Sequence, residues 1–171
     1  MKCADNREEL FPVVDAAGRV VGRATRGECH GGSMHPVVHL HLFNSCGELY
    51  LQKRPAWKDI QPGRWDTAVG GHVDWGEEPL AALRREVREE VGVTDFEPQH
   101  VLTYLFESER ERELVYVYKT VYDGPVVPSG ELDGGRFWTL REIAEGVGGG
   151  IFTPNFEGEI RRVAELPDVG R

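Results

Sequence analysis

The sequence predicts an α+β fold in which a mixed β-sheet lies between helices, giving an α/β/α sandwich. Short runs of β-type residues stand before and after one strongly helical segment near the middle of the chain, and a second helical segment lies near its end. This order of elements is typical of a sheet with helices on both faces. The 171 residues fit one domain, 1–171, which is large enough to bury a core.

Short runs of alternating apolar or β-branched residues predict the strands. The first two runs flank the turn Ala16-Ala17-Gly18 and predict an N-terminal β-hairpin at about 10–26. A glycine-rich loop is expected to follow at 27–36. The predicted strands span residues 11–15, 19–25, 37–43, 48–54, 99–107, 114–121 and 134–140.

Two helices are predicted in the C-terminal part of the chain. A short helix begins at Leu140 and is broken by the glycines at 148–150. In the last helix, Asn155 is the expected N-cap, and the helix continues to about Glu165. Its apolar side would be formed by Phe156, Ile160 and Val163.

The central helix is predicted to follow a flexible turn at the glycine pair Gly70-Gly71. Gly92 stands where a helix typically stops. Apolar residues at helical spacing predict a buried stripe formed by Leu80, Leu83, Val87 and Val91.

The same helix carries more charge than a buried face needs. Glu86, Glu89 and Glu90 lie at positions i, i+3 and i+4, where like charges repel by about 0.2–0.5 kcal/mol per pair. A hard divalent cation such as Mg²⁺ takes carboxylate oxygens and would offset this repulsion. Charge composition alone favours a solvated acidic face instead, so the choice depends on the wider motif.

Composition excludes several classes of partner. The net charge of −9 argues against a nucleic-acid polymer, because phosphate backbones bind basic surfaces. Cys3, Cys29 and Cys46 have no metal-type spacing and are expected to be thiols. No apolar run approaches the roughly 18 residues of a membrane span, and the polar N-terminus lacks a signal-peptide core. We therefore expect a cytoplasmic protein without membrane contact, and the sequence leaves a homodimer open.

The loop 55–65 has the composition of a substrate rim. An aromatic side chain can stack on a base or cover an apolar group, and Lys or Arg can bind phosphate oxygens. The alternative is that the tryptophans pack the loop against the protein. With the end of the preceding strand, the candidate residues are Arg54, Trp57, Lys58, Arg64 and Trp65.

The stretch from Gly71 to Val93, GHVDWGEEPLAALRREVREEVGV, resembles the Nudix box at every defined position. Gly71 is followed after five residues by Glu77 and after seven more by Arg85-Glu86-Val87. Glu89-Glu90 and Gly92-Val93 complete the pattern. The resemblance extends through the flanking strands over most of the chain and implies the Nudix fold. It also reverses the choice made from charge alone, in favour of a metal site.

The Nudix hydrolase superfamily hydrolyses nucleoside diphosphates linked to another group, and related diphosphates, with Mg²⁺ or Mn²⁺. The resemblance therefore implies a small-molecule diphosphate as substrate. It implies that Glu77 pairs with Arg85 to hold loop and helix together. The metal ligands that it implies are Glu86, Glu89, Glu90 and the carbonyl of Gly70.

Outside the box, the chain is similar to the branch of this superfamily that contains isopentenyl-diphosphate isomerase. The similarity lies in His30, in His35 and in the segments 42–44, 51–54, 62–65 and 71–72. The isomerases bind a metal through three histidines and two glutamates. The matching residues here are His30, His35, His72, Glu111 and Glu113.

Gly70 stands where the isomerases have a cysteine that transfers a proton. Moving a proton on and off an allylic carbon needs an acid and a base on opposite faces, and glycine supplies neither. Hydrolysis is therefore the favoured reaction, with Glu89 as first choice for the general base and Glu86 as the next. Isomerase activity and a non-catalytic nucleotide-binding module are the alternatives.

The roles of three histidines are inferred from their positions in the predicted elements. His39 and His41 share one face of a predicted strand and are expected to be packed or surface residues. His72 directly follows the glycine pair, where contact with a metal or a substrate phosphate is as well supported as a structural role.

Overall fold

The computed structural model describes residues 7–58 and 60–170. Cys29 and Cys46 are free thiols, and Cys3 lies outside the described residues. No helix in the described part of the chain is long and apolar enough to cross a membrane.

A mixed sheet of seven strands forms the centre of the protein. Its middle strand, β3 (Met34–Phe43), pairs in parallel with β8 (Arg112–Val121), and all other pairs are antiparallel. The strand order is β5-β4-β3-β8-β7, with β6 also paired to β3 and β9 to β4. The remaining strands are β4 (Leu49–Lys53), β5 (Trp65–Thr67), β6 (Val69–His72), β7 (Gln99–Glu107) and β9 (Gly135–Trp138).

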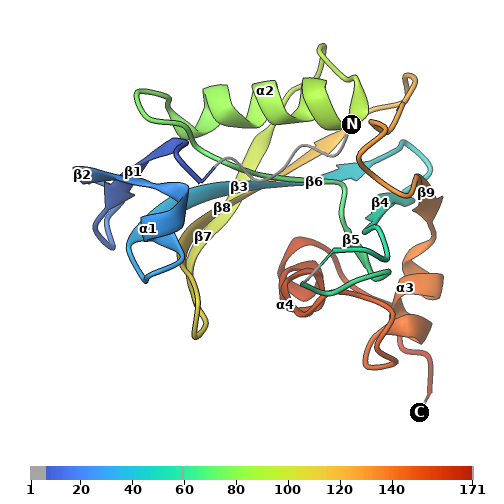
Figure 1. Ribbon diagram of the computed structural model, residues 1–171. Helices are drawn as coiled ribbons and strands as arrows, with labels where there is room; N and C mark the ends of the chain where they lie inside the picture. The colour runs from blue at the N-terminus through green and yellow to red at the C-terminus, as the bar shows by residue number, and fades with distance from the viewer. Residues whose placement is uncertain (1–6, 59, 171) are drawn as a thin grey trace.

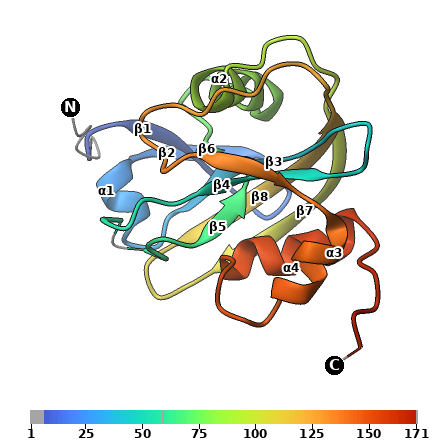
Figure 2. The same cartoon turned by 90° about the vertical axis from the view of Figure 1, so that its right-hand side faces the viewer.

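Helices cover both faces of this sheet, as the sequence predicts. Helix α2 (Pro79–Val91) lies along one face, and α3 (Leu140–Gly146) and α4 (Pro154–Val163) lie on the other (Figure 1). Figure 2 shows α2 and the pair α3 and α4 on opposite sides of the strands. The observed architecture is an α+β sandwich.

Each helical layer has its own apolar core. Leu83 and Val87 of α2 are fully buried in one cluster with Val38, Leu40 and Leu42 of β3. Burial of each such side chain contributes about 1.5–3 kcal/mol. On the other face, a second cluster contains Leu49, Leu51, Ile143, Phe156 and Ile160. The two cores hold α2 and α4 at fixed positions on either side of β3.

A two-stranded hairpin precedes the main sheet. Its strands, β1 (Leu10–Val14) and β2 (Val20–Thr25), pair antiparallel. The short helix α1 (Arg26–Cys29) follows at once, because Thr25 and Glu28 form a reciprocal capping box. Phe11 of β1 is buried and stacks on His72, so the hairpin packs beside the end of β6.

Four local predictions were wrong. Residues 27–36, expected as a loop, contain the end of α1 and the start of β3. Leu80, expected in the buried stripe of α2, is 43% exposed because it lies in the first turn of the helix, beyond the sheet contact. The cap of α4 is the Thr153 hydroxyl rather than Asn155, and the helix ends at Val163 rather than Glu165.

The fourth error concerns the glycine pair. Gly70 and Gly71 lie in strand β6, paired with His39 and Val38, and do not form a flexible turn. The turn into α2 comes later, at Asp74–Gly76, where Gly76 has a φ of 83°. Pro79 then takes the first helical position, where its missing N–H is not needed. Gly92 ends the helix in the left-handed conformation, as expected.

Candidate active site

The close approach of β6 and α2 forms one side of the candidate site. A Cβ added to Gly71 would overlap the carboxyl group of Glu86. The backbone N–H of Gly70 donates to Oε2 of Glu90 at 3.3 Å. The two glycines therefore allow two carboxylates of the helix to lie directly against the strand.

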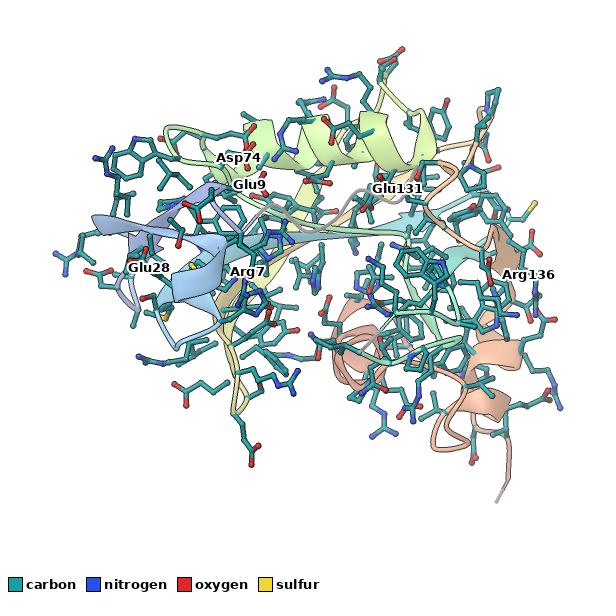
Figure 3. The ribbon with its side chains drawn as sticks, viewed as in Figure 1. Arg7, Glu9, Glu28, Asp74, Glu131 and Arg136 are labelled. Carbon is teal, nitrogen blue, oxygen red and sulfur yellow. The ribbon has the colours of Figure 1, made fainter. Side chains whose placement is uncertain are left out.

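Arg85 holds this arrangement together. Its guanidinium donates two parallel hydrogen bonds to Glu77, with Nε–Oε2 at 2.9 Å and Nη2–Oε1 at 3.0 Å. It also donates to Oε1 of Glu86 at 2.8 Å and to the carbonyl of His72 at 3.0 Å. Asp74, marked in Figure 3 beside the loop into α2, lies 3.4 Å from the same group. The predicted contact between Glu77 and Arg85 is thus present in a bidentate geometry.

The box carboxylates differ in their surroundings. Burial raises the pKa of Glu86, although Arg85 opposes this shift. Burial, and then the charge of Glu86, raise the pKa of Glu90 well above its usual range. The Glu89 side chain is 54% exposed, and its Oε2 lies 3.4 Å from Nη1 of Arg85. Two desolvated carboxylates side by side favour a bound cation, so these oxygen donors fit a hard divalent ion.

A second set of potential ligand side chains lies closer together than the carboxylates of the box. Among the described residues, one group of three offers ligand atoms that all lie within 4.8 Å of one another: His35, His72 and Glu113. The carboxylates of Glu86, Glu89 and Glu90 do not form such a group. His35 and Glu113 are direct partners across β3 and β8, and His72 is at the end of β6.

The two other residues of the isomerase-like set lie beside this group. His30 Nδ1 is 3.5 Å from Oε1 of Glu111. Burial, and then a hydrogen bond between the carboxyl groups of Glu113 and Glu111, raise the pKa of Glu113 to about 8. All five residues of the predicted second metal site, His30, His35, His72, Glu111 and Glu113, are therefore neighbours in the fold.

The two inner histidines of this set favour the neutral form. Burial lowers the pKa of His72 to about 3 and lowers that of His35 as well. Their rings stack at a centroid distance of 5.3 Å, and Phe11 stacks on the other side of His72 at 4.7 Å. Neutral imidazoles are the form that binds metals, so these donors also fit a divalent ion.

The predicted substrate rim is used in part for packing. Arg64 donates to the carbonyl of Phe152 at 3.3 Å, and Trp65 packs edge-on against Trp138. Arg54 lies 3.6 Å from Asp66. Arg136, labelled in Figure 3, lies over the ring of Trp138.

Trp57 lies closer to solvent than the other predicted rim residues, which are partly buried. Trp57 is exposed, and the ammonium of Lys58 lies 5.1 Å from the centre of its ring. Of the predicted rim, Trp57 has the accessible surface that substrate contact requires.

A buried polar network on α4 was missed by the sequence analysis. Glu159 is 2% exposed and accepts hydrogen bonds from His39 Nδ1 at 2.7 Å, His41 Nε2 at 3.0 Å and the Tyr104 hydroxyl at 2.6 Å. The signal was available: position 159 falls on the apolar side of the helix, between Phe156 and Ile160. His41 is buried and His39 is partly buried, and both bind an ionisable partner.

The charges of this network depend on each other. The His39 imidazolium is the main factor that holds the pKa of Glu159 far below its usual range against the effect of burial. In the other direction, burial lowers the pKa of His39, but Glu159 outweighs this effect and raises it to about 9. His39 is therefore the cation that accompanies the buried carboxylate.

A cavity of about 250 Å³ opens between β7 and α4, next to this network. Leu102, Tyr104 and Phe106 line it from the strand, with Gly158, Glu159 and Arg162 from the helix. A larger hollow of about 810 Å³ lies against the C-terminal tail, where it is lined by Leu166 and Pro167 and none of the candidate site residues. The smaller cavity adjoins the buried network around Glu159.

Comparison with known proteins shows which family has this fold and this box. The NUDIX domain family matches residues 33–156, which span β3 to the start of α4 and include the box. The chain belongs to the Nudix family. It is a Nudix-type hydrolase by its family match and its relatives.

The curated relatives include both activities that the sequence raised. A Nudix hydrolase of Pseudomonas aeruginosa, described as uncharacterized, is 34% identical over 131 residues, which cover 75% of this chain and 78% of that protein. An isopentenyl-diphosphate Delta-isomerase of Serratia proteamaculans is 29% identical over 144 residues, 81% of this chain and 79% of that protein.

Solved structures confirm the Nudix fold. A Deinococcus radiodurans protein superposes with a TM-score of 0.75 at 24% identity and covers 90% of this chain and 98% of its own. The NUDIX domain of Shewanella oneidensis NrtR, solved with ADP ribose, has a TM-score of 0.62 at 14% identity and covers 75% of this chain and 84% of its own.

Proposed function

We propose that this Nudix hydrolase uses Mg²⁺ or Mn²⁺ to hydrolyse a diphosphate linkage in a nucleoside diphosphate derivative or a related small organic diphosphate. The observation that carries the proposal is the pair of partly buried carboxylates, Glu86 and Glu90, held against Gly71 and Gly70. Packing alone does not explain two desolvated like charges at this position.

Different residues of the chain would bind the metal and keep its ligands in position. Glu86, Glu89, Glu90 and the carbonyl of Gly70 would hold the metal. A bound divalent ion lowers the pKa of water and neutralises phosphate charge. Arg85 keeps Glu86 and the His72 carbonyl in place.

Glu89 is the proposed general base that takes a proton from the attacking water. Its side chain is 54% exposed, and its contact with Arg85 is long at 3.4 Å. It therefore has the accessibility that proton transfer requires. Glu86 is the second candidate, because its ion pair with Arg85 at 2.8 Å already occupies one of its carboxylate oxygens.

The nucleoside part of the proposal has two supports. The structurally similar NUDIX domain of Shewanella oneidensis NrtR was solved with ADP ribose, a nucleoside diphosphate derivative. The cavity between β7 and α4 has apolar walls large enough to contact the group attached to a diphosphate. The net charge of −9 supports a small-molecule partner rather than a nucleic-acid polymer.

A panel of diphosphates with and without Mg²⁺ tests the proposal. We expect Mg²⁺-dependent release of phosphate or nucleoside monophosphate from at least one nucleoside diphosphate derivative, and loss of this release with EDTA. A chain that binds a nucleotide without releasing product would instead be the non-catalytic module.

Isomerase activity is the second candidate, because five residues matching the isomerase metal site lie together around His35, His72 and Glu113. The proton-transferring side chain is missing. Gly70 occupies its position, and a Cβ added there would lie 3.3 Å from Cδ2 of His39. The space available to a cysteine is thus already limited by the histidine ring.

We therefore expect no isomerisation of isopentenyl diphosphate. Incubated in D₂O with Mg²⁺ or Mn²⁺ and followed by proton NMR, the wild-type protein should form no dimethylallyl product and should exchange no solvent deuterium into the substrate. Appearance of the dimethylallyl signals would replace the hydrolase with the isomerase as the assigned activity.

A further inference from the structure

Strand β7 leaves one edge of the main sheet open. It is the last strand in the order β5-β4-β3-β8-β7, and its outer edge pairs with no strand of the described residues. At the other end of this order the edge is covered, because Trp65 of β5 donates to the carbonyl of Ile151 at 2.8 Å and accepts from the N–H of Thr153 at 2.9 Å. An open edge presents a row of backbone donors and acceptors to another strand. With nine residues, β7 is long enough to bind one.

Apolar side chains lie on both faces of this edge strand. Leu102, Tyr104 and Phe106 are on the α4 face and are each partly exposed. Leu105 is on the other face and is 44% exposed. Helix α2 does not cover it, because the apolar cluster beneath α2 includes residues of β8 but no described residue of β7. The open edge is therefore also an apolar one.

The sequence of β7 complements itself in an antiparallel pairing centred on Tyr104. Residues that lie directly opposite each other in such a pair are on the same face of the sheet. On the α4 face, Leu102 would lie opposite Phe106 of a second copy, and Tyr104 opposite its own counterpart. On the other face, Thr103 would lie opposite Leu105. No residue from 102 to 106 is charged, although each chain carries a net charge of −9, so two copies can meet here without like charges in the ladder.

Both ends of this ladder have a feature that limits pairing. The register of β7 against β8 shifts between His100 and Leu102, so the regular part of the strand begins at Leu102. At the other end, Glu107 is charged and lies 3.1 Å from Nε of Arg112. Register shifts and charged side chains both oppose pairing at a strand edge. The segment that remains, 102–106, is the one that is symmetric about Tyr104.

The edge of β2 in the N-terminal hairpin is also open among the described residues, but its sequence suits such a pairing less well. A pairing centred on the exposed Val21 would bring Arg19 opposite Arg23 of the second copy, and like charges directly opposite are destabilising. A pairing centred on Gly22 would have no side chains at its middle. The two edges therefore differ, and β7 is the better site for a second copy.

We propose that two copies of this chain form a two-fold dimer through residues 102–106 of β7, which joins their main sheets edge to edge. Such an interface is isologous, so each copy supplies the same surface. Leu102, Tyr104 and Phe106 also line the cavity between β7 and α4, so the second copy would lie beside this cavity along its strand wall. The inference concerns assembly and does not depend on the proposed hydrolase function.

Sedimentation equilibrium of the full chain tests the dimer. The wild-type protein should associate reversibly to a species of twice the 19.2 kDa of one chain. Leu105→Lys should raise the dissociation constant by about tenfold or more, because a lysine on an edge strand opposes pairing with another strand. Since Leu105 is 44% exposed, the circular dichroism spectrum of the variant should match that of the parent.

Val21→Lys is the matched control. It places the same charge at an exposed apolar position on the other open edge, β2, so the dissociation constant should stay within about twofold of the parent's. Dissociation by Val21→Lys with no effect of Leu105→Lys would assign the interface to the hairpin and overturn the proposal. A wild-type chain that stays monomeric at its highest soluble concentration would also overturn it, and would leave the edge to an extended segment of another protein.

Engineered cysteines test the register, in a background with Cys3→Ser and Cys46→Ser. Thr103→Cys combined with Leu105→Cys should give a disulfide-linked dimer on mild oxidation, because opposite residues of an antiparallel pair have Cα atoms about 4.5–5.5 Å apart, within reach of a disulfide. Thr103→Cys alone should not, because its counterpart lies opposite Leu105. A double variant that sediments as a dimer but does not crosslink, or a single variant that does, would overturn the pairing centred on Tyr104.

Discussion

Glu89→Gln is expected to lower kcat by at least about a hundredfold and to leave the fold intact, because loss of a general base costs about 10²–10⁴ in rate. The substitution removes the proton acceptor and one metal-binding charge but keeps the shape of the side chain. Since Glu89 is exposed, its effect on the free energy of unfolding should stay within about 0.5 kcal/mol. Steady-state kinetics with Mg²⁺ and a thermal melt of the same sample measure both effects.

Glu78→Gln provides the control for this experiment. Glu78 is an exposed carboxylate at the start of the same helix and makes no side-chain cap hydrogen bond. Its replacement makes the same change in net charge and should leave kcat within about twofold. Full activity of Glu89→Gln, or hydrolysis that persists in EDTA, would contradict the metal site built on the box.

Arg85→Ala should lower the melting temperature by roughly 6–20 °C, in addition to reducing activity. Removing one partner of a partly buried ion pair typically costs about 3–5 kcal/mol, and about 1 kcal/mol shifts the melting temperature of a chain of this size by roughly 2–4 °C. The loss is large because Glu77 loses two hydrogen bonds and the His72 carbonyl loses another. Calorimetry or circular dichroism measures the shift.

Arg88→Ala is the matched control for stability. Arg88 lies one turn along the same helix and is exposed, so its removal should cost no more than about 1 kcal/mol. Equal melting temperatures for Arg85→Ala and the parent, together with normal metal affinity, would show that the bidentate contact does not hold loop and helix together.

Much of the fold follows from sequence patterns because the patterns and the packing agree. Leu83, Val87 and Val91 repeat at helical spacing and are all buried against β3. Gly92 ends the helix with the left-handed backbone that glycine favours. The resemblance to the Nudix box likewise implies that Glu77 pairs with Arg85, and the structure shows this contact between the loop before α2 and the helix.

The predictions were wrong or incomplete where the local structure depends on contacts with distant parts of the chain. Gly70 and Gly71 look like a turn locally, but β3 offers them a strand partner and Glu86 needs the space that they leave. Glu159 looks like an ordinary charged helix residue until His39 and Tyr104, from two other strands, are seen to meet it. A single-sequence pattern carries no information about such partners.

The parallel pairing of β3 with β8 has a consequence for how the protein folds. These strands are far apart in the chain, and α2 lies in the segment between them, so a long loop must close before their hydrogen bonds form. The β7–β8 hairpin is local and can form earlier. When β8 docks, its register decides whether Glu113 faces His35: a slip by one residue would turn Glu113 to the α2 face. We therefore expect a divalent ion present during refolding to favour the native register, through donors that only this register brings together.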